Sequence, residues 1–213
     1  MAYKKFIASL NYRLKMAKLF LLRHLKSQWN LENKFTGWTD VPLCEEGIES
    51  APEVAKGLAG MKIDKVYTSP LIRNKETASL ILKNIGQEDL LVEENKALDE
   101  RNYGELQGLN KDEVKKHYGE EQVRLWRRSY NVAPPGGESL KDVYKRAVPF
   151  YKKYVEKDLK AGKNVLVVAS HNSLRAIVKY IENIPDEKII DLELPFGALI
   201  KYDFENKNYL HLQ

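Results

Sequence analysis

The chain has 213 residues, 43% of them hydrophobic and 31% charged, and its 35 basic and 30 acidic side chains give a net charge of +5. This length fits one globular domain, the apolar fraction excludes wholesale disorder, and no apolar run approaches the roughly 20 residues that a membrane helix needs. The single cysteine, Cys44, excludes a disulfide framework and a cysteine-based zinc site, and it indicates a reducing compartment such as the cytoplasm.

The basic excess lies mostly in the first 15 residues. This segment contains four of the 35 basic residues and no acidic residue, which leaves 31 basic and 30 acidic side chains in the rest of the chain. Its basic, amphipathic character is typical of transit peptides and membrane-surface helices. A disordered or non-native extension is the simpler interpretation, because Met16 is a second candidate start. We therefore expect residues 1–15 to be an extension of one catalytic domain, residues 16–213.

Strand and helix patterns alternate along the chain. Short apolar runs bounded by polar or turn residues predict buried parallel strands at residues 18–22, 65–68, 165–169 and 198–204. Helical patterns are found at residues 44–58, 75–85, 111–118, 121–128, 139–161 and 173–183. This alternation predicts an α/β fold, a three-layer sandwich with a mainly parallel sheet and helices on both faces.

Polar side chains follow three of the predicted strands. The first strand runs directly into Arg23 and His24. The third runs into Ser170 and His171, and Arg73 follows the second strand. Ligands of open α/β sheets bind beyond the carboxyl ends of the strands, so two histidines at strand ends, each with an arginine nearby, favour a site over two structural histidines.

Histidine and arginine together are suited to phosphoryl transfer. A neutral imidazole is a good nucleophile towards phosphorus, and forked guanidinium hydrogen bonds neutralise phosphoryl oxygens. The reaction depends mostly on positioning and charge stabilisation, so it needs no metal, although an acid must protonate the leaving alkoxide. The sequence contains no P-loop, dinucleotide-binding glycine motif or spaced set of zinc ligands.

Several segments resemble the cofactor-dependent phosphoglycerate mutases of the histidine phosphatase superfamily. In chain order they are RH at residues 23–24, TGW at 36–38, YTSPLIR at 67–73, LDERNYG at 98–104, LQGLNK at 106–111, WRRSY at 126–130, PPGGESL at 134–140 and NSLRA at 172–176. The similarity extends from about residue 18 to residue 204. The TGW, LQGLNK and WRRSY segments are specific to the mutase branch.

The resemblance implies an isomerase of glycolysis and gluconeogenesis. It would interconvert 3-phosphoglycerate and 2-phosphoglycerate through a phosphohistidine primed by 2,3-bisphosphoglycerate, without a metal. The implied catalytic residues are His24 as phosphoryl acceptor, His171 as second imidazole and Glu100 as acid and base. The implied substrate-binding residues are Arg23, Ser27, Asn30, Thr36, Gly37, Arg73, Tyr103, Lys111, Arg127, Arg128 and Asn172. The family is often dimeric or tetrameric, which implies a homodimer or homotetramer.

Two residues after His24 depart from the family pattern. The family has Gly and Glu where this chain has Leu25 and Lys26. Glycine permits a positive φ and close backbone approach, so we expect Leu25 to distort the loop or crowd the pocket. We expect Lys26, in place of a carboxylate, to lower the pKa of His24 or to add a phosphate contact.

The second histidine motif is shifted by one residue. The family reads HGNSLR, whereas this chain reads SHNSLR, so the family histidine aligns with Ser170 and its glycine with His171. A local slip of one residue returns His171 to the site, but neighbouring side chains of a strand point to opposite faces. Asn102 also stands where the mutases usually have His.

Two alternative functions stay open at this point. In a histidine-type phosphatase acting on small phosphorylated metabolites, water would reach the phosphohistidine, and the short segment after the last predicted strand favours such a leak. A catalytically degenerate homologue would bind phosphoglycerate or a protein partner without turnover. Nucleic-acid binding is disfavoured, because aromatic residues are not interleaved with a basic stripe.

Overall fold

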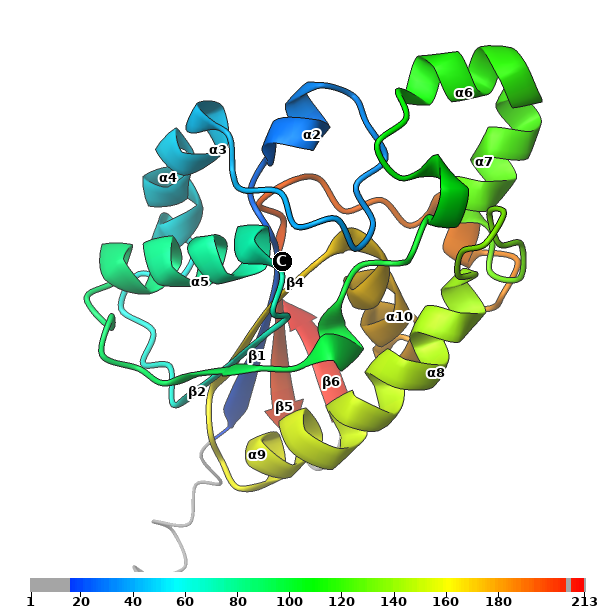
Figure 1. Cartoon of the computed structure of the whole chain (residues 1–213). Coiled ribbons are helices and arrows are strands. Elements are labelled where there is room, and N and C mark those ends of the chain that lie inside the picture. Colours follow the sequence, from blue (N-terminus) through cyan, green and yellow to red (C-terminus); the bar gives the residue numbers. More distant parts are fainter. Residues whose placement is uncertain (1–15, 206–207, 213) are drawn as a thin grey trace, which may run out of the picture.

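A six-stranded sheet forms the centre of the computed structural model, which describes residues 16–205 and 208–212 (Figure 1). The spatial order of the strands is β3-β2-β4-β1-β5-β6. Their bounds are β1 (Ala17–Arg23), β2 (Lys65–Thr68), β3 (Val92–Glu94), β4 (Val165–Ala169), β5 (Leu199–Glu205) and β6 (Asn208–Leu212). The extension expected at residues 1–15 lies outside the described residues.

The sheet is mainly parallel, as predicted, but one predicted orientation is wrong. Strands β1, β2, β3 and β4 run parallel to one another, whereas β5 runs antiparallel to both β1 and β6. The segment at residues 198–204 was expected to be a parallel strand. Leu199 pairs with Leu22, so the chain returns to the carboxyl end of β1 before β5 begins. The reversal therefore brings the loop before β5 to the same edge of the sheet as the ends of β1 and β4.

Helices occupy all six regions in which the sequence predicts them. Two of these regions are interrupted. The first divides at Ser50, two residues before Pro52, because proline has no amide hydrogen to donate to the preceding helical turn. The fifth contains a π-helical turn, η3 (Tyr151–Val155), which begins two residues after Pro149. The helices are α2 (Gln28–Leu31), α3 (Glu45–Glu49), α4 (Ala51–Lys56), α5 (Ile72–Asn84), α6 (Lys111–Tyr118), α7 (Glu120–Arg128), α8 (Leu140–Phe150), α9 (Glu156–Lys160) and α10 (His171–Ile181). Three short 3₁₀ turns are η1 (Lys96–Leu98), η2 (Gly104–Leu106) and η4 (Ile189–Asp191).

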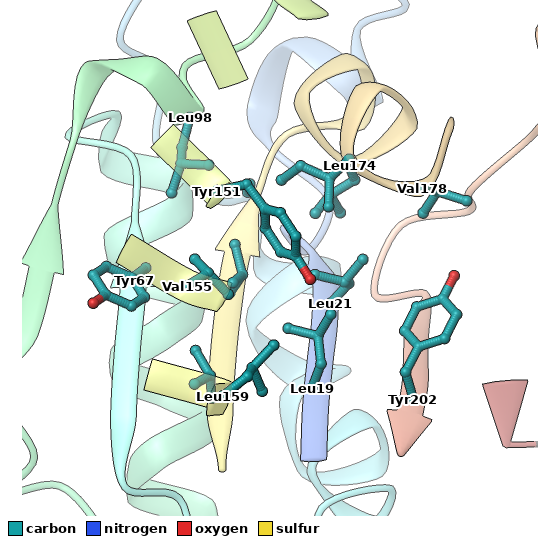
Figure 2. Close-up of a cluster of buried hydrophobic side chains, with 14 of the residues drawn as sticks. Leu19, Leu21, Tyr67, Leu98, Tyr151, Val155, Leu159, Leu174, Val178 and Tyr202 are labelled. Carbon is teal, nitrogen blue, oxygen red and sulfur yellow. The ribbon is translucent and has the colours of Figure 1, made fainter. Parts of the chain in front are cut away.

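Alternation along β1 divides the core into two layers. Phe20 and Leu22 pack into the cluster under α4 and α5, whereas Leu19 and Leu21 pack against α8, η3, α9 and α10. Figure 1 shows these two groups of helices on opposite sides of the sheet. Figure 2 shows Leu19 and Leu21 facing Tyr151 on this second side. Each buried leucine stabilises the fold by roughly 1.5–3 kcal/mol. The predicted three-layer arrangement is confirmed, and it holds the ends of β1 and β4 rigidly.

No helix within residues 16–205 and 208–212 is long and apolar enough to cross a bilayer.

Candidate active site

A cavity of about 270 Å³ opens at the carboxyl ends of β1 and β4, where it is closed on the far side by α6 and α7. Twelve of the fourteen residues that the sequence predicts for the site line it. They are Arg23, His24, Asn30, Thr36, Gly37, Arg73, Glu100, Tyr103, Lys111, Arg127, Arg128 and His171. Segments far apart in the chain therefore meet here, as the positions at strand ends predict.

His24 follows the last residue of β1 and is almost fully buried. Its Nδ1 lies 2.6 Å from the carbonyl oxygen of Leu25. A carbonyl oxygen only accepts, so Nδ1 carries the proton and Nε2 keeps its lone pair. Burial, together with the charges of Arg73 and Arg23, holds the pKa of His24 well below its usual range. The residue is thus a neutral imidazole with a free nitrogen, which can act as a nucleophile.

Arg23 and Arg73 flank this imidazole from two elements. Arg73, on α5, donates to the carbonyl oxygens of Gly37 at 2.7 Å and Thr39 at 3.0 Å, and its side chain is fully buried. The guanidinium of Arg23 lies 3.9 Å from the centre of the Phe196 ring. Burial lowers the pKa of Arg23 to about 10, so the group stays charged at neutral pH. The two cations can hold an anionic group beside His24.

Gly37 is the position where backbone geometry requires glycine. Its φ is +57°, and a Cβ atom there would lie 2.0 Å from Oε1 of Gln107. The same oxygen accepts a hydrogen bond from the amide of Trp38. The turn at Gly37 thereby presents the carbonyl oxygen that orients Arg73.

Glu100 supplies a buried carboxylate at the same edge. Its Oε1 accepts hydrogen bonds from the amide of Arg101 at 2.7 Å and from the amide of Asn172, in the first turn of α10, at 3.1 Å. Burial alone would raise the pKa of Glu100, but His171, these two hydrogen bonds and Arg73 outweigh it and lower the pKa to about 2. The carboxylate is therefore ionised at neutral pH, which is the form that a general base requires.

The structure brings His171, rather than Ser170, to the cavity. Strand β4 ends at Ala169, so the alternation of side chains in a strand does not extend to the next two residues. Ser170 is the fully buried N-cap residue of α10, and its Oγ accepts a hydrogen bond from Nδ2 of Asn74 at 3.0 Å. His171 is the first residue of α10 and lines the cavity. Burial lowers its pKa to about 4, although Glu193 opposes this shift.

Three further cations line the cavity. Lys111 begins α6, and Arg127 and Arg128 end α7. Burial, with the nearby charges of Arg127 and Arg23, lowers the pKa of Lys111 to about 8. The cavity thus gathers five cationic side chains, counting Arg23 and Arg73, which suits a ligand with two anionic groups. Within residues 16–205 and 208–212, no group of three histidine, cysteine or carboxylate side chains is arranged to hold a metal ion.

The family model of the histidine phosphatase superfamily (branch 1) matches residues 19–212. This chain belongs to the histidine phosphatase superfamily. It is 48% identical to the 2,3-bisphosphoglycerate-dependent phosphoglycerate mutase of Bradyrhizobium diazoefficiens, over 86% of this chain and 90% of that protein. It is 44% identical to the enzyme of the same name from Parvibaculum lavamentivorans, over 89% and 91% of the two chains. The resemblance predicted from the motifs is confirmed.

A solved structure supports the same relationship. The phosphoglycerate mutase of Bacillus anthracis superposes with a TM-score of 0.78 at 27% identity, and the match covers 93% of this chain and 92% of that one. The phosphoglycerate mutase-like α/β fold is thereby confirmed.

The residues that depart from the superfamily pattern next to His24 lie away from the cavity. The Leu25 side chain packs with Leu43 and Ala51, and it is not part of the cavity lining. The expected crowding of the pocket by Leu25 is therefore wrong. Lys26 pairs with Glu46 at 2.7 Å and does not line the cavity, so the expected phosphate contact is wrong. The pKa of His24 is lowered mainly by burial, Arg73 and Arg23 rather than by Lys26.

Asn102 has a local role in the backbone. Its Oδ1 accepts a hydrogen bond from the amide of Gly104 at 2.8 Å, and its own amide donates to Glu138. It is not part of the cavity lining.

Ser27 and Asn172, the two remaining predicted site residues, lie behind the cavity wall. Ser27 is buried and donates from Oγ to Oδ1 of Asn30 at 2.8 Å, which orients a residue that does line the cavity. Asn172 accepts from Arg101 at 2.7 Å through its side chain and donates to Glu100 through its amide. Both are placed to support neighbouring site residues.

Sequence reasoning missed five residues that line the cavity: Asn33, Lys34, Phe35, Glu193 and Phe196. The first three directly precede the TGW motif, and that proximity was the available signal. Glu193 and Phe196 lie in the loop before β5. No motif marks them, and only the antiparallel direction of β5 brings them to this edge of the sheet.

Proposed function

We propose that this protein interconverts 3-phosphoglycerate and 2-phosphoglycerate by passing a phosphoryl group through His24. The observation that carries the proposal is a neutral imidazole with an unprotonated Nε2, placed with Arg23, Arg73 and the carboxylate of Glu100 around one cavity. The relatives at 44–48% identity that are named as phosphoglycerate mutases support this reaction over hydrolysis.

The donor set of the cavity fits 2,3-bisphosphoglycerate. Three polar atoms of lining residues, Nε of Arg23, Oγ1 of Thr36 and Nε2 of His171, are buried without a hydrogen-bond partner, as expected of groups that await a ligand. Arg23 and Arg73 would hold one phosphate beside His24, and Lys111, Arg127 and Arg128 would hold the opposite end. The bisphosphate would supply the phosphoryl group that loads His24.

The residues of this chain divide the remaining chemistry between them. His24 attacks phosphorus through Nε2, while its Nδ1–H stays bonded to the Leu25 carbonyl, which fixes the ring. Glu100 accepts the proton of the substrate hydroxyl that receives the phosphoryl group. It donates a proton to the substrate oxygen from which a phosphoryl group leaves. His171 donates a hydrogen bond to the phosphoryl group during its transfer, which stabilises the negative charge of the transition state.

One incubation tests the proposal against the two alternatives. The protein is mixed with 2,3-bisphosphoglycerate, acid-labile phosphate on His24 is sought by mass spectrometry, and both phosphoglycerate isomers and free phosphate are followed. Isomer exchange without stoichiometric phosphate release supports the mutase. Phosphate release alone supports a phosphatase. The absence of both phospho-His24 and turnover would indicate a degenerate binding protein.

Compartment, domain and assembly complete the proposal. We propose that residues 16–213 form one catalytic domain that works in the cytoplasm, because its single cysteine, Cys44, is buried and unpaired. The family implies a homodimer or homotetramer, which sedimentation of the full chain would measure.

We predict that His171→Ala lowers kcat by about 10²- to 10³-fold, the cost of removing one hydrogen-bond donor to a transition state. The matched control is Ser170→Ala, which removes a buried hydroxyl that bonds Asn74 and does not line the cavity. The control is expected to keep kcat within about threefold. A larger loss for Ser170→Ala than for His171→Ala would show that the catalytic position follows the family alignment instead.

We predict that the KM for 3-phosphoglycerate rises as pH increases through about 8. The Lys111 ammonium is charged below its pKa of about 8 and neutral above it, so an anionic ligand loses this attraction at high pH. At pH 9 only about one in ten Lys111 side chains stays protonated, so KM is expected to rise about tenfold from its value at pH 7. Lys111→Met should flatten this profile, whereas Lys115→Met, on the same helix and outside the cavity lining, should not.

A further inference from the structure

The cavity contains a carboxylate that the proposed chemistry does not use. Glu100 and Glu193 are the two acidic residues of its lining, and only Glu100 has a proton-transfer role. Glu193 forms an ion pair with Arg128, and its Oε1 lies 3.4 Å from Nε2 of His171. Burial alone would raise the pKa of Glu193, but His171 and Arg128 lower it to about 2, so the carboxylate is charged at neutral pH.

The backbone next to Glu193 is held in place, whereas its side chain is half exposed. Arg23 donates to the carbonyl oxygen of Leu194, and the amide of Gly197 donates to the carbonyl oxygen of His24 at 3.4 Å. The side chain of Glu193 is 50% exposed, and its contact with His171 is not a well-directed hydrogen bond, since Nε2 of His171 has no hydrogen-bond partner. The carboxylate can therefore swing out towards solvent without disturbing the loop.

Arg128 is the cation with which the Glu193 carboxylate pairs. Arg128 lines the cavity with Lys111 and Arg127, and its guanidinium forms an ion pair with Glu193. A phosphate or carboxylate of a bound phosphoglycerate would need the same guanidinium hydrogens. Two anions cannot use one guanidinium edge without repelling each other.

We propose that Glu193 is a specificity-determining residue of the cavity, an internal anion that a ligand must displace from Arg128. The inference rests on the proposed function, which makes the ligand a phosphoglycerate. Binding then exchanges one ion pair for another, so the affinity is lower than the cations alone would provide. A ligand with more negative charge at the Arg128 end meets more repulsion from Glu193, so this residue tunes the balance between the monophosphates and the bisphosphate.

The test is the affinity for 3-phosphoglycerate, measured by titration calorimetry at fixed salt with the full chain. Glu193→Gln keeps the size of the side chain and removes its charge. It should bind about two- to fivefold more tightly than the unmodified protein, which is the range expected for a half-exposed ion pair. The matched control is Glu187→Gln, which removes an exposed charge from the same connection between α10 and β5 without touching the cavity. It should leave the affinity unchanged.

A second pair of variants isolates Arg128. If competition for this guanidinium is the cause, Glu193→Gln should give no gain in an Arg128→Ala background. An equal gain with and without Arg128 would mean a diffuse field effect and would overturn the proposal. Weaker binding by Glu193→Gln, or an equal gain in Glu187→Gln, would overturn it as well.

The same titration separates this inference from the proposed function. Tight binding of 3-phosphoglycerate without isomer exchange would contradict the mutase assignment. The ratio of the affinities of Glu193→Gln and the unmodified protein would still decide the role of Glu193. If neither the unmodified protein nor Glu193→Gln binds 3-phosphoglycerate, there is no competing anion and the inference is wrong.

Discussion

His24→Ala is expected to lower kcat for isomer exchange by at least about 10³-fold and to abolish acid-labile phosphate on the protein. The reason is that His24 lines the cavity beside Arg23 and Arg73 with a free Nε2, and a covalent route ends when its nucleophile is removed. Kinetics with both isomers and mass spectrometry of the intact protein measure the two effects.

The matched control for this change is His117→Ala. His117 is exposed on α6, where its ring meets that of Tyr118 edge to face, and it lies outside the cavity lining. The thermal unfolding of both variants should also be measured, because His24 is buried and its replacement can destabilise the fold. Phosphate that persists on a well-folded His24→Ala protein would contradict the assignment of the nucleophile.

Glu100→Gln is expected to lower kcat with phosphoglycerate by about 10²- to 10⁴-fold, the usual contribution of general acid–base catalysis. The amide oxygen of glutamine can still accept from the amides of Arg101 and Asn172, so the loop should keep its geometry. The decisive measurement compares phosphoglycerate with an aryl phosphate such as p-nitrophenyl phosphate, whose leaving group needs no proton. The loss should be much smaller for the aryl phosphate.

Glu105→Gln serves as the control, because Glu105 is an exposed carboxylate on η2 that does not line the cavity. An equal loss for both substrates in Glu100→Gln would mean that Glu100 positions the phosphoryl group and moves no proton.

The elements with apolar alternation or a helical period were predictable from the sequence, and the others were not. β3 has a single apolar residue, Val92, and exists because its backbone pairs with β2. β6 is held by pairing with β5 and by Tyr209, whose hydroxyl bonds that of Tyr151 at 2.8 Å. Backbone pairing of this kind leaves no periodic signal in one strand alone.

The candidate site followed from motifs wherever side chains sit at the ends of predicted parallel strands. His24 and Arg73 are of this kind. Glu193 and Phe196 are not, because their position depends on the reversed direction of β5, which an apolar run such as that at residues 198–204 does not reveal. The placement of His171 was ambiguous for a related reason: the residue where β4 stops and α10 starts decides which side chain faces the cavity.

The reversed strand also determines which end of the chain is suited to attachment. β6 runs antiparallel to β5 and therefore heads back towards the cavity: Leu212 pairs with Lys201, which pairs with Phe20, three residues or about 10 Å before Arg23. The sheet begins at Ala17, at the opposite end of β1. A carrier protein or an immobilising surface joined on the Ala17 side is attached at the end of the sheet opposite the cavity, whereas one joined after β6 is attached nearer the end that carries the cavity.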